Sequence, residues 1–209
     1  SMTDDQARHL ADLTRLGMAG NLADFVLIDK DGAVKKGSEI DYNGAPGGYA
    51  ADPTEVVNYV SKHDNQTLWD MISYKAAQEA DLDTRVRMQA VSLATVMLGQ
   101  GIAFDQQGSE LLRSKSFTRD SYDSGDWFNR VDYSLQDNNY NVGMPRSSDD
   151  GSNYDIIARV KDAVATPGET ELKQMTAFYQ ELTALRKSSP LFTLGDGATV
   201  MKRVDFRNT

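Results

Sequence analysis

Three consecutive polar residues, His63, Asp64 and Asn65, follow the apolar run Val56–Val60 and are the first candidates for chemistry. If that run is a parallel strand, their side chains lie at its carboxyl end, where α/β barrels and open sheets place their sites. A carboxylate there can stabilise positive charge, and a neighbouring histidine can donate a hydrogen bond to a substrate hydroxyl. The alternative is structural: Asp64 or Asn65 caps the helix that follows. These three residues alone leave both interpretations open.

A second candidate is the segment Asp126-Trp127-Phe128-Asn129-Arg130, in which an acid and a base are four residues apart. On a helical turn, Asp126 and Arg130 would share one face. Such a pair offers an acceptor and a fork of donors, which suits the hydroxyl groups of a sugar. The alternative is a solvated surface salt bridge worth ~0–1 kcal/mol. Without further information, the residues favour the salt bridge.

Other acidic residues give weaker signals. Glu110 follows the second predicted strand, and a structural acceptor role is favoured over a ligand-facing one. Neither of two acidic clusters has the twelve-residue calcium loop with its terminal glutamate, and turn formation by Asp and Gly explains both: Asp29 with Asp31, and Asp149 and Asp150 with Asp155. We therefore assign no metal ligands in this chain. The sequence also lacks a phosphate-binding glycine loop, a G-x-S-x-G motif and a dinucleotide fingerprint.

The composition narrows the class of protein. The 209 residues include 31 acidic and 22 basic side chains, for a net charge of −9, which argues against a nucleic-acid binder. The absence of cysteine excludes disulfides, thiol catalysis and cysteine zinc sites, and two histidines are too few for a histidine-rich metal centre. No apolar run approaches the ~20 residues of a membrane span. At ~150 residues per domain, the length predicts one domain, or one and a fragment of another.

The elements that must position these candidates form a strand–helix–strand pattern. Val56–Val60 is rich in β-branched and aromatic residues and predicts a buried strand. Residues 83–98 carry one apolar face at helical spacing, and Gly99 ends the helix. Ile102–Phe104 predicts a second short buried strand. Together they indicate a βαβ unit with a parallel strand pair and a right-handed crossover.

The rest of the chain is mostly helical in pattern. A capping box at Thr3–Gln6 predicts a helix, residues 25–36 a β-hairpin, and residues 67–78 a short helix. Residues 106–153 have no period but contain interspersed aromatic residues, which indicates a functional rather than a disordered stretch. Helices are predicted over 154–163 and 169–187, and the alternation in Thr199–Phe206 predicts an edge strand that starts a second domain. Ser1-Met2 is interpreted as a cloning remnant.

The segment Val57–Asp70 closely resembles a defining segment of the alpha-amylase clan of glycoside hydrolases, and within that clan the pullulanases. The likeness extends to further segments over nearly the whole chain: Asn21–Phe25, Asp41–Gly44, Gln107–Lys115, Ser121–Asp126 and Leu185–Leu191. The sequence most resembles the large secreted, cell-surface bacterial pullulanases. The resemblance therefore implies a secreted or cell-surface location and hydrolysis of α-1,6 linkages in pullulan and branched dextrins with retention of configuration.

The resemblance also implies a fold and residue roles. The fold is α/β, the carboxyl-terminal part of an incomplete (β/α)8 barrel: residues 3–190 correspond to about helix six to helix eight, and 191–209 to the start of a β-sandwich domain. Asp64 matches the third catalytic carboxylate, which holds substrate hydroxyls and favours the oxocarbenium-like transition state. His63 matches the substrate-binding histidine beside it. Asp126 and Arg130 match a glucose-binding pair.

The nucleophile and the general acid/base that a retaining glycosidase requires are not found. In the family they follow barrel strands four and five, so we expect the chain to be a fragment that is inactive alone. It would need the missing remainder of the barrel, or self-association, to cover its apolar faces. No cofactor is certain, and calcium stays open for the full-length enzyme. The alternative is a non-catalytic α-glucan-binding module that uses Tyr122, Trp127, Phe128 and Arg130 as a sugar platform.

Overall fold

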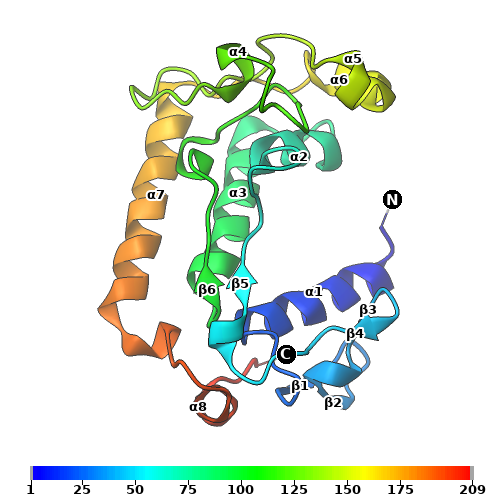
Figure 1. The fold of residues 1–209 in the computed structure, drawn as a ribbon, viewed down its shortest axis with the longest axis vertical. Helices are drawn as coiled ribbons and strands as arrows, with labels where there is room; N and C mark the ends of the chain where they lie inside the picture. The colour runs from blue at the N-terminus through cyan, green and yellow to red at the C-terminus, as the bar shows by residue number, and fades with distance from the viewer. Residues whose placement is uncertain (1, 208–209) are drawn as a thin grey trace. The chain divides into compact units, whose positions relative to one another are not determined.

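The computed structural model describes residues 2–207 (Figure 1). Ser1 of the predicted cloning remnant and the last two residues of the predicted β domain lie outside the described part. The described residues cluster into two compact units. The first unit comprises the described residues of 1–59, 95–104 and 184–209, and the second comprises 60–94 and 105–183. The predicted division of the chain after residue 190 stays a prediction.

The first unit begins with helix α1 (Asp4–Met18), whose start confirms the predicted capping box. The Thr3 hydroxyl accepts from the Gln6 amide at 3.2 Å, and the Gln6 side chain accepts from the Thr3 amide at 2.9 Å. Two antiparallel pairs follow: β1 (Val26–Ile28) with β2 (Val34–Lys36), as predicted, and the shorter β3 (Asp41–Tyr42) with β4 (Ala45–Pro46).

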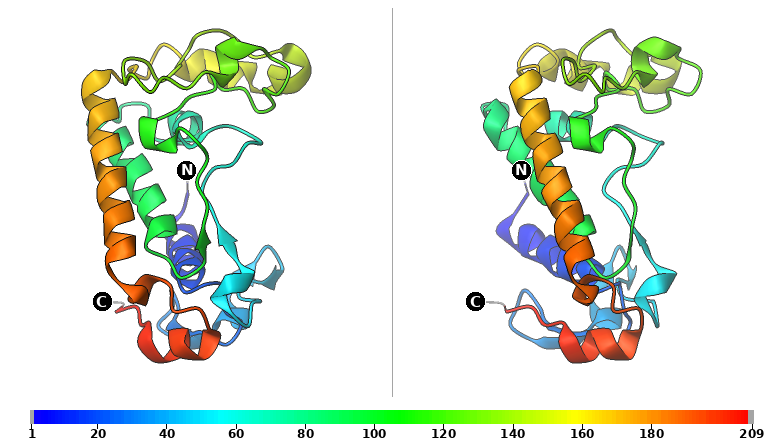
Figure 2. Two further views of the ribbon diagram at one scale, coloured as in Figure 1. Left: turned by 60° about the vertical axis from the view of Figure 1, so that its left-hand side comes forward. Right: turned by 90° about the vertical axis from the view of Figure 1, so that its left-hand side faces the viewer.

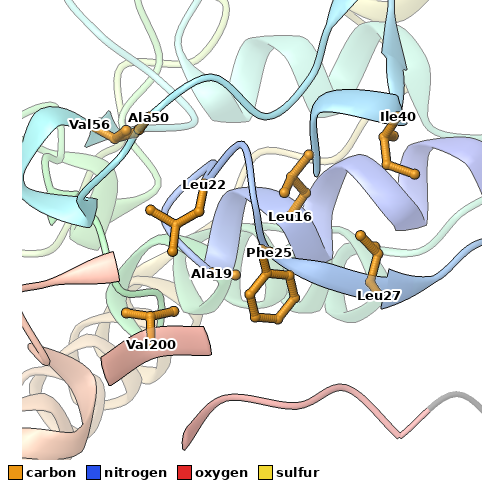
Figure 3. Packing of buried hydrophobic residues seen from close by; sticks show 9 residues of the cluster. All are labelled: Leu16, Ala19, Leu22, Phe25, Leu27, Ile40, Ala50, Val56 and Val200. Carbon is orange, nitrogen blue, oxygen red and sulfur yellow. The ribbon is translucent and has the colours of Figure 1, made fainter. Parts of the chain in front are cut away.

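The core of the first unit is formed where α1, the chain after it and the last helix meet. Figure 3 shows the buried side chains of this cluster, with Phe25 and Leu22 close to Leu16 of α1. Its members are Leu16, Ala19, Leu22, Phe25, Leu27, Ile40, Ala50, Val56 and Val200. Phe206 adds an edge-to-face contact to the Phe25 ring, with 6.0 Å between ring centroids. This packing holds segments of distant sequence together.

Strands β5 (Val57–Asn58) and β6 (Ile102–Ala103) pair in parallel, with Val57 opposite Ile102. This confirms the predicted parallel pair, with helix α3 (Leu82–Met97) between the strands in sequence. The prediction that both strands are buried is wrong for one face. Val57, Tyr59, Ile102 and Phe104 are each about half exposed, because a two-stranded pair has no neighbour to cover that face.

The predicted edge strand at Thr199–Phe206 is also wrong. The chain there forms helix α8 (Gly197–Arg203), which Asp196 caps by accepting from the Thr199 amide at 2.9 Å. The buried Val200 of this helix belongs to the core of the first unit. A β-carbon on Gly197 would lie 2.0 Å from the carbonyl oxygen of Ala51, so this close approach requires glycine. Local capping and packing therefore override the alternating pattern.

The second unit contains most of the helices: α2 (Leu68–Lys75), the greater part of α3, the single turns α4 (Asp126–Asn129) and α5 (Ser147–Asp150), α6 (Tyr154–Val160), and most of α7 (Glu169–Ser188). Figure 2 shows the long irregular stretch between β6 and α7, green to yellow, interrupted by short helices only. Buried aromatics order part of it: the Phe117 ring stacks on Tyr74 and meets Tyr140 edge-to-face. The remaining short elements are 3-10 turns at Gly37–Glu39, Pro53–Glu55, Ser109–Leu111, Gly151–Asn153 and Pro190–Phe192.

The described residues are thus rich in helix and hold three separate two-stranded pairs, with no closed barrel among them. No described helix combines the length and the apolar character that crossing a bilayer requires.

Candidate functional site

The segment that contains His63 and Asp64 is held at both ends. The Ser61 hydroxyl donates to the side-chain oxygen of Gln106 at 2.6 Å, and both residues are buried. At the other end, Thr67 caps α2 by accepting from the Asp70 amide at 3.2 Å. The helix cap is therefore Thr67, and the alternative in which Asp64 or Asn65 caps this helix is wrong. The side chains of Asp64 and Asn65 are therefore not used to cap α2.

Asp64 and His63 both face solvent. The side chain of Asp64 is 58% exposed and that of His63 is 83% exposed. The Lys62 ammonium lies 2.5 Å from one Asp64 oxygen, and the His63 Nε2 lies 3.5 Å from the other. The hydrogen bond from Lys62 lowers the pKa of Asp64 below its usual value, so this carboxylate is ionised at neutral pH. An exposed anion beside an imidazole can interact with a ligand that approaches from solvent.

A polar hollow of about 350 Å³ lies at this place. It is lined by Asp64, Asn65, Arg119, Asp120 and Asp149. Asn65 has a φ of 63°, in the left-handed region that asparagine tolerates better than most residues. The hollow offers several carboxylates and one guanidinium, which are partners for a ligand rich in hydroxyl groups. It does not contain Asp126 or Arg130.

Asp126 and Arg130 line a second hollow of about 420 Å³, together with Trp127, Asn129 and Val131. The structure thus brings the predicted pair to one site, but the expected ion pair between them is wrong. The carboxylate partners of Arg130 are Asp137, at 3.2 Å, and Asp132, at 3.8 Å. Helix α4 ends at Asn129, and Arg130 leaves the helical conformation with a ψ of 138°, so the i, i+4 geometry does not apply.

The turn that carries this second hollow is fixed by Asn129. Its side-chain amide donates to the carbonyls of Ser121 and Gly125 at 2.6 and 2.9 Å, and its oxygen accepts from the Ser121 hydroxyl at 2.8 Å. The indole of Trp127 remains 73% exposed on this fixed turn. Trp127 therefore presents an apolar face at a hollow that also contains charged groups, an arrangement suited to the apolar face of a sugar ring.

The weaker candidates are structural in their contacts. Glu110 accepts from the Gly108 amide at 3.0 Å, consistent with the favoured acceptor role. Asp29 accepts from the amides of Asp31 and Ala33, both at 2.9 Å, and so closes a turn. Within the part of the chain that the structure describes, no group of three or more acidic or histidine side chains could hold a metal ion. Calcium binding by a full-length enzyme stays a prediction.

Sequence reasoning missed two buried charged residues next to the site. Asp70 is fully buried at the start of α2, where its position after an N-cap is typical of an ordinary capping residue. Lys115 is 1% exposed, and its ammonium donates to the carbonyl oxygen of His63 at 3.0 Å. The sequence carries no signal for this contact, because the two residues are 52 positions apart in irregular segments.

Comparison with known proteins supports the resemblance to pullulanases. Residues 135–209 match the model of a family described as the C-terminal domain of pullulanase-type alpha-1,6-glucosidases. Over all 209 residues the chain is 98% identical to a pullulanase of Klebsiella aerogenes, of which it spans 19%. It is 43% identical over 195 residues to chloroplastic pullulanase 1 of Arabidopsis thaliana, covering 92% of this chain and 20% of that protein.

Solved structures of pullulanases are also similar to this chain. A crystal structure of Klebsiella pneumoniae pullulanase complexed with maltotriose superimposes with a TM-score of 0.98 at 98% identity, covering 100% of this chain and 20% of that one. The chain therefore spans about a fifth of the length of the relatives that it matches.

Proposed function

The chain belongs to the pullulanase family, as a segment of longer enzymes, and from this premise we propose that it supplies one of three catalytic carboxylates for hydrolysis of α-1,6-glucosidic linkages. The substrates are pullulan and branched α-glucans. The fold of the whole domain is a (β/α)8 barrel of the alpha-amylase clan, in which β5 and β6 are neighbouring strands. We keep residues 191–209 as the region where a β-sandwich domain would begin, although the described residues there form helix α8 rather than a strand.

Asp64 carries the chemistry that this segment contributes. In a retaining glycosidase a nucleophile and a general acid/base act on the two sides of the scissile bond, through an oxocarbenium-like transition state. A third, ionised carboxylate lowers the energy of that state by electrostatic stabilisation and by holding substrate hydroxyls. The observation that carries the proposal is the exposed, ionised Asp64, 3.5 Å from His63 Nε2 on the wall of a polar hollow. His63 would donate to a sugar hydroxyl.

A second glucose unit would bind at Asp126 and Arg130. Both residues line the hollow beside Trp127. The Asp126 carboxylate and the Arg130 guanidinium group would accept from and donate to sugar hydroxyls. Asp137 and Asp132 keep the Arg130 side chain in place through the two ion pairs. The maltotriose complex of the Klebsiella pneumoniae relative supports an α-glucan ligand for the longer protein.

The nucleophile and the general acid/base would come from polypeptide outside this segment. We therefore expect the segment alone to be inactive. The exposed apolar side chains on β5 and β6 support the interpretation of the chain as one part of a larger domain, because an uncovered strand face favours association. The remaining strands of the barrel would cover them in the longer protein, and self-association would cover them in the isolated segment.

A non-catalytic α-glucan-binding module is the second candidate function. The exposed Trp127 at a hollow of about 420 Å³ favours it, since sugar binding at that place needs no catalytic acids. We further propose a secreted or cell-surface location, on the resemblance to the large bacterial pullulanases. Fractionation of cells that produce the full-length protein tests that location.

The test of function uses both the full-length enzyme and the segment. Asp64→Asn in the full-length enzyme is expected to lower kcat on pullulan by ~10²–10³-fold, with a smaller change in KM. Asp24→Asn, an exposed carboxylate paired with Lys36, is the matched control and should leave kcat unchanged. An unchanged kcat for Asp64→Asn, or a loss through KM alone, would contradict the role. If the isolated segment hydrolysed pullulan at nearly the rate of the full-length enzyme, the proposal that it is an inactive fragment would be refuted. Binding of maltotriose by the isolated segment without hydrolysis would favour the α-glucan-binding module.

A further inference from the structure

Lys115 is buried in the second unit although an ammonium group is costly to remove from water. Burial lowers its pKa most, while the charge of Asp70 raises it, as do the weaker effects of Asp120 and Asp64. The Nζ atom donates to the carbonyl oxygen of His63 at 3.0 Å. The buried charge therefore contacts the backbone of the segment that carries the proposed catalytic carboxylate.

The backbone of Lys115 is itself fixed by Asp70. The buried Asp70 carboxylate accepts from the Lys115 amide at 2.9 Å, from the Phe117 amide at 3.1 Å and from the Ser114 hydroxyl at 2.5 Å. Ser116 and Phe117 have φ values of 48° and 69°, a conformation that costs free energy and persists only where surrounding contacts impose it. Asp70 thus anchors an unusual turn whose second residue is Lys115.

The same carboxylate lies at the start of α2, six residues after Asp64 in the chain. The segment from His63 to Thr67 is therefore connected to Asp70 at both of its ends. Its C-terminal end continues into the first turn of α2, which contains Asp70. Its N-terminal end is held at the His63 carbonyl by Lys115, whose backbone amide is bound by the Asp70 carboxylate. The peptide that joins His63 to Asp64 is therefore fixed at its carbonyl oxygen.

We propose that Lys115 is a positioning residue for Asp64, which it acts on by holding the His63 carbonyl and by contributing a buried positive charge to the surroundings of the carboxylate. The inference rests on the proposed function of Asp64. The charge effect has the right sign: the hydrogen bond from Lys62 lowers the pKa of Asp64 most, and the charge of Lys115 acts in the same direction.

The test is Lys115→Met in the full-length enzyme, a change that keeps the chain length of the side chain and removes its charge and its donors. Misplacement of a catalytic group by about 1 Å can cost ~10²-fold in rate, so kcat is expected to fall ~10–100-fold with KM changed less than about 3-fold. Lys115→Arg, which retains the charge and the donors, is expected to recover most of the kcat. An unchanged kcat per folded molecule of Lys115→Met would overturn the proposal.

Arg85 provides the matched structural control. It is as buried as Lys115 and donates to the backbone carbonyls of Ala80, Ile72, Ala77 and Gln78, outside the site. Arg85→Met should lower the melting temperature and leave kcat per folded molecule unchanged. If the kcat loss of Lys115→Met were reproduced by Arg85→Met, Lys115 would have a general structural role only. If Lys115→Met does not fold, Lys115→Gln, which loses the charge, is expected to show the same kcat loss, and an unchanged value overturns the proposal.

A double variant separates this inference from the proposed function. If Lys115 acts through Asp64, Lys115→Met in the Asp64→Asn background causes no further loss of kcat, whereas an independent role gives a further loss of the same factor. A normal kcat for Asp64→Asn alone would refute the function proposed for Asp64. A low kcat for Asp64→Asn together with a normal kcat for Lys115→Met would refute the positioning role only.

Discussion

The Ser61 hydroxyl donates to Gln106 across 45 positions of sequence, the same offset that pairs Val57 with Ile102 in the parallel strands. The register of β5 and β6 is therefore repeated by side chains three residues after each strand ends. Because Ser61 lies two residues before His63, this hydrogen bond fixes the chain at the start of the candidate site.

Removing this hydrogen bond is expected to destabilise the full-length enzyme. Gln106→Ala leaves the buried Ser61 hydroxyl without its acceptor, at a cost of about 1–2 kcal/mol. Ser61→Ala should cost less, and the double variant should show a coupling of about 1 kcal/mol. Denaturant unfolding of the four proteins measures these values. Strictly additive effects of the two substitutions would show that the contact contributes nothing.

Stability should also depend on pH through Asp105. Burial raises the pKa of this carboxyl to about 6, and the charge of Glu110 adds to the effect. Because the folded state binds the proton more tightly, the contribution of Asp105 to stability is complete below about pH 4 and is lost as pH rises through 6. A shift of about two units corresponds to ~3 kcal/mol, which partial exposure and solvent screening reduce to about 1–2 kcal/mol.

Asp105→Asn removes this dependence, so it should stabilise the enzyme more at pH 7.5 than at pH 4.5, relative to the unsubstituted protein. Melting temperatures at the two pH values provide the measurement. Asp24→Asn, on the exposed surface, is the control and should show no such difference. An equal effect of Asp105→Asn at both values would mean that Asp105 ionises in the folded state as it does in the unfolded chain.

Trp127 should contribute to glucan affinity without contributing to chemistry. Loss of its exposed ring in Trp127→Ala removes a stacking surface worth about 1 kcal/mol, so the affinity of the full-length enzyme for maltotriose should fall ~5–10-fold. Trp127→Phe should retain most of the affinity. Calorimetric titration measures the change, and Tyr49→Ala, at another exposed aromatic residue, is the control. An unchanged affinity for Trp127→Ala would exclude this hollow as a sugar site.

The cap of α8 can be tested on its own. Asp196→Ala removes the carboxylate that accepts from the Thr199 amide and should cost about 1 kcal/mol of stability. Asp196→Asn or Asp196→Ser should retain most of it, because both side chains cap helices well. Thermal unfolding distinguishes them. Equal stability of the Ala and Asn variants would show that packing of Val200 alone holds this helix.

Elements with a strong local pattern could be predicted from the sequence. The capping box of α1, the helices at Leu82–Met97 and Glu169–Ser188 and the hairpin after Phe25 are all present at nearly the expected bounds. The parallel pairing of β5 with β6 was predictable as well, since a helix between two short apolar runs favours it. The alternation of apolar and polar residues from Thr199 to Phe206 gave a wrong strand prediction, because the capping carboxylate of Asp196 outweighed this weak pattern.

By itself, the sequence determined the family, through segments spread along the chain, and with it the residues most worth testing. Only the tertiary structure decided that Thr67 rather than Asp64 caps α2, that Arg130 pairs with Asp132 and Asp137, and that Lys115 reaches His63. The reason is physical: helix periodicity and capping act over a few neighbouring residues, whereas these contacts depend on how irregular segments pack. Burial and hydrogen bonding choose among their many conformations, and no spacing in the sequence encodes that choice.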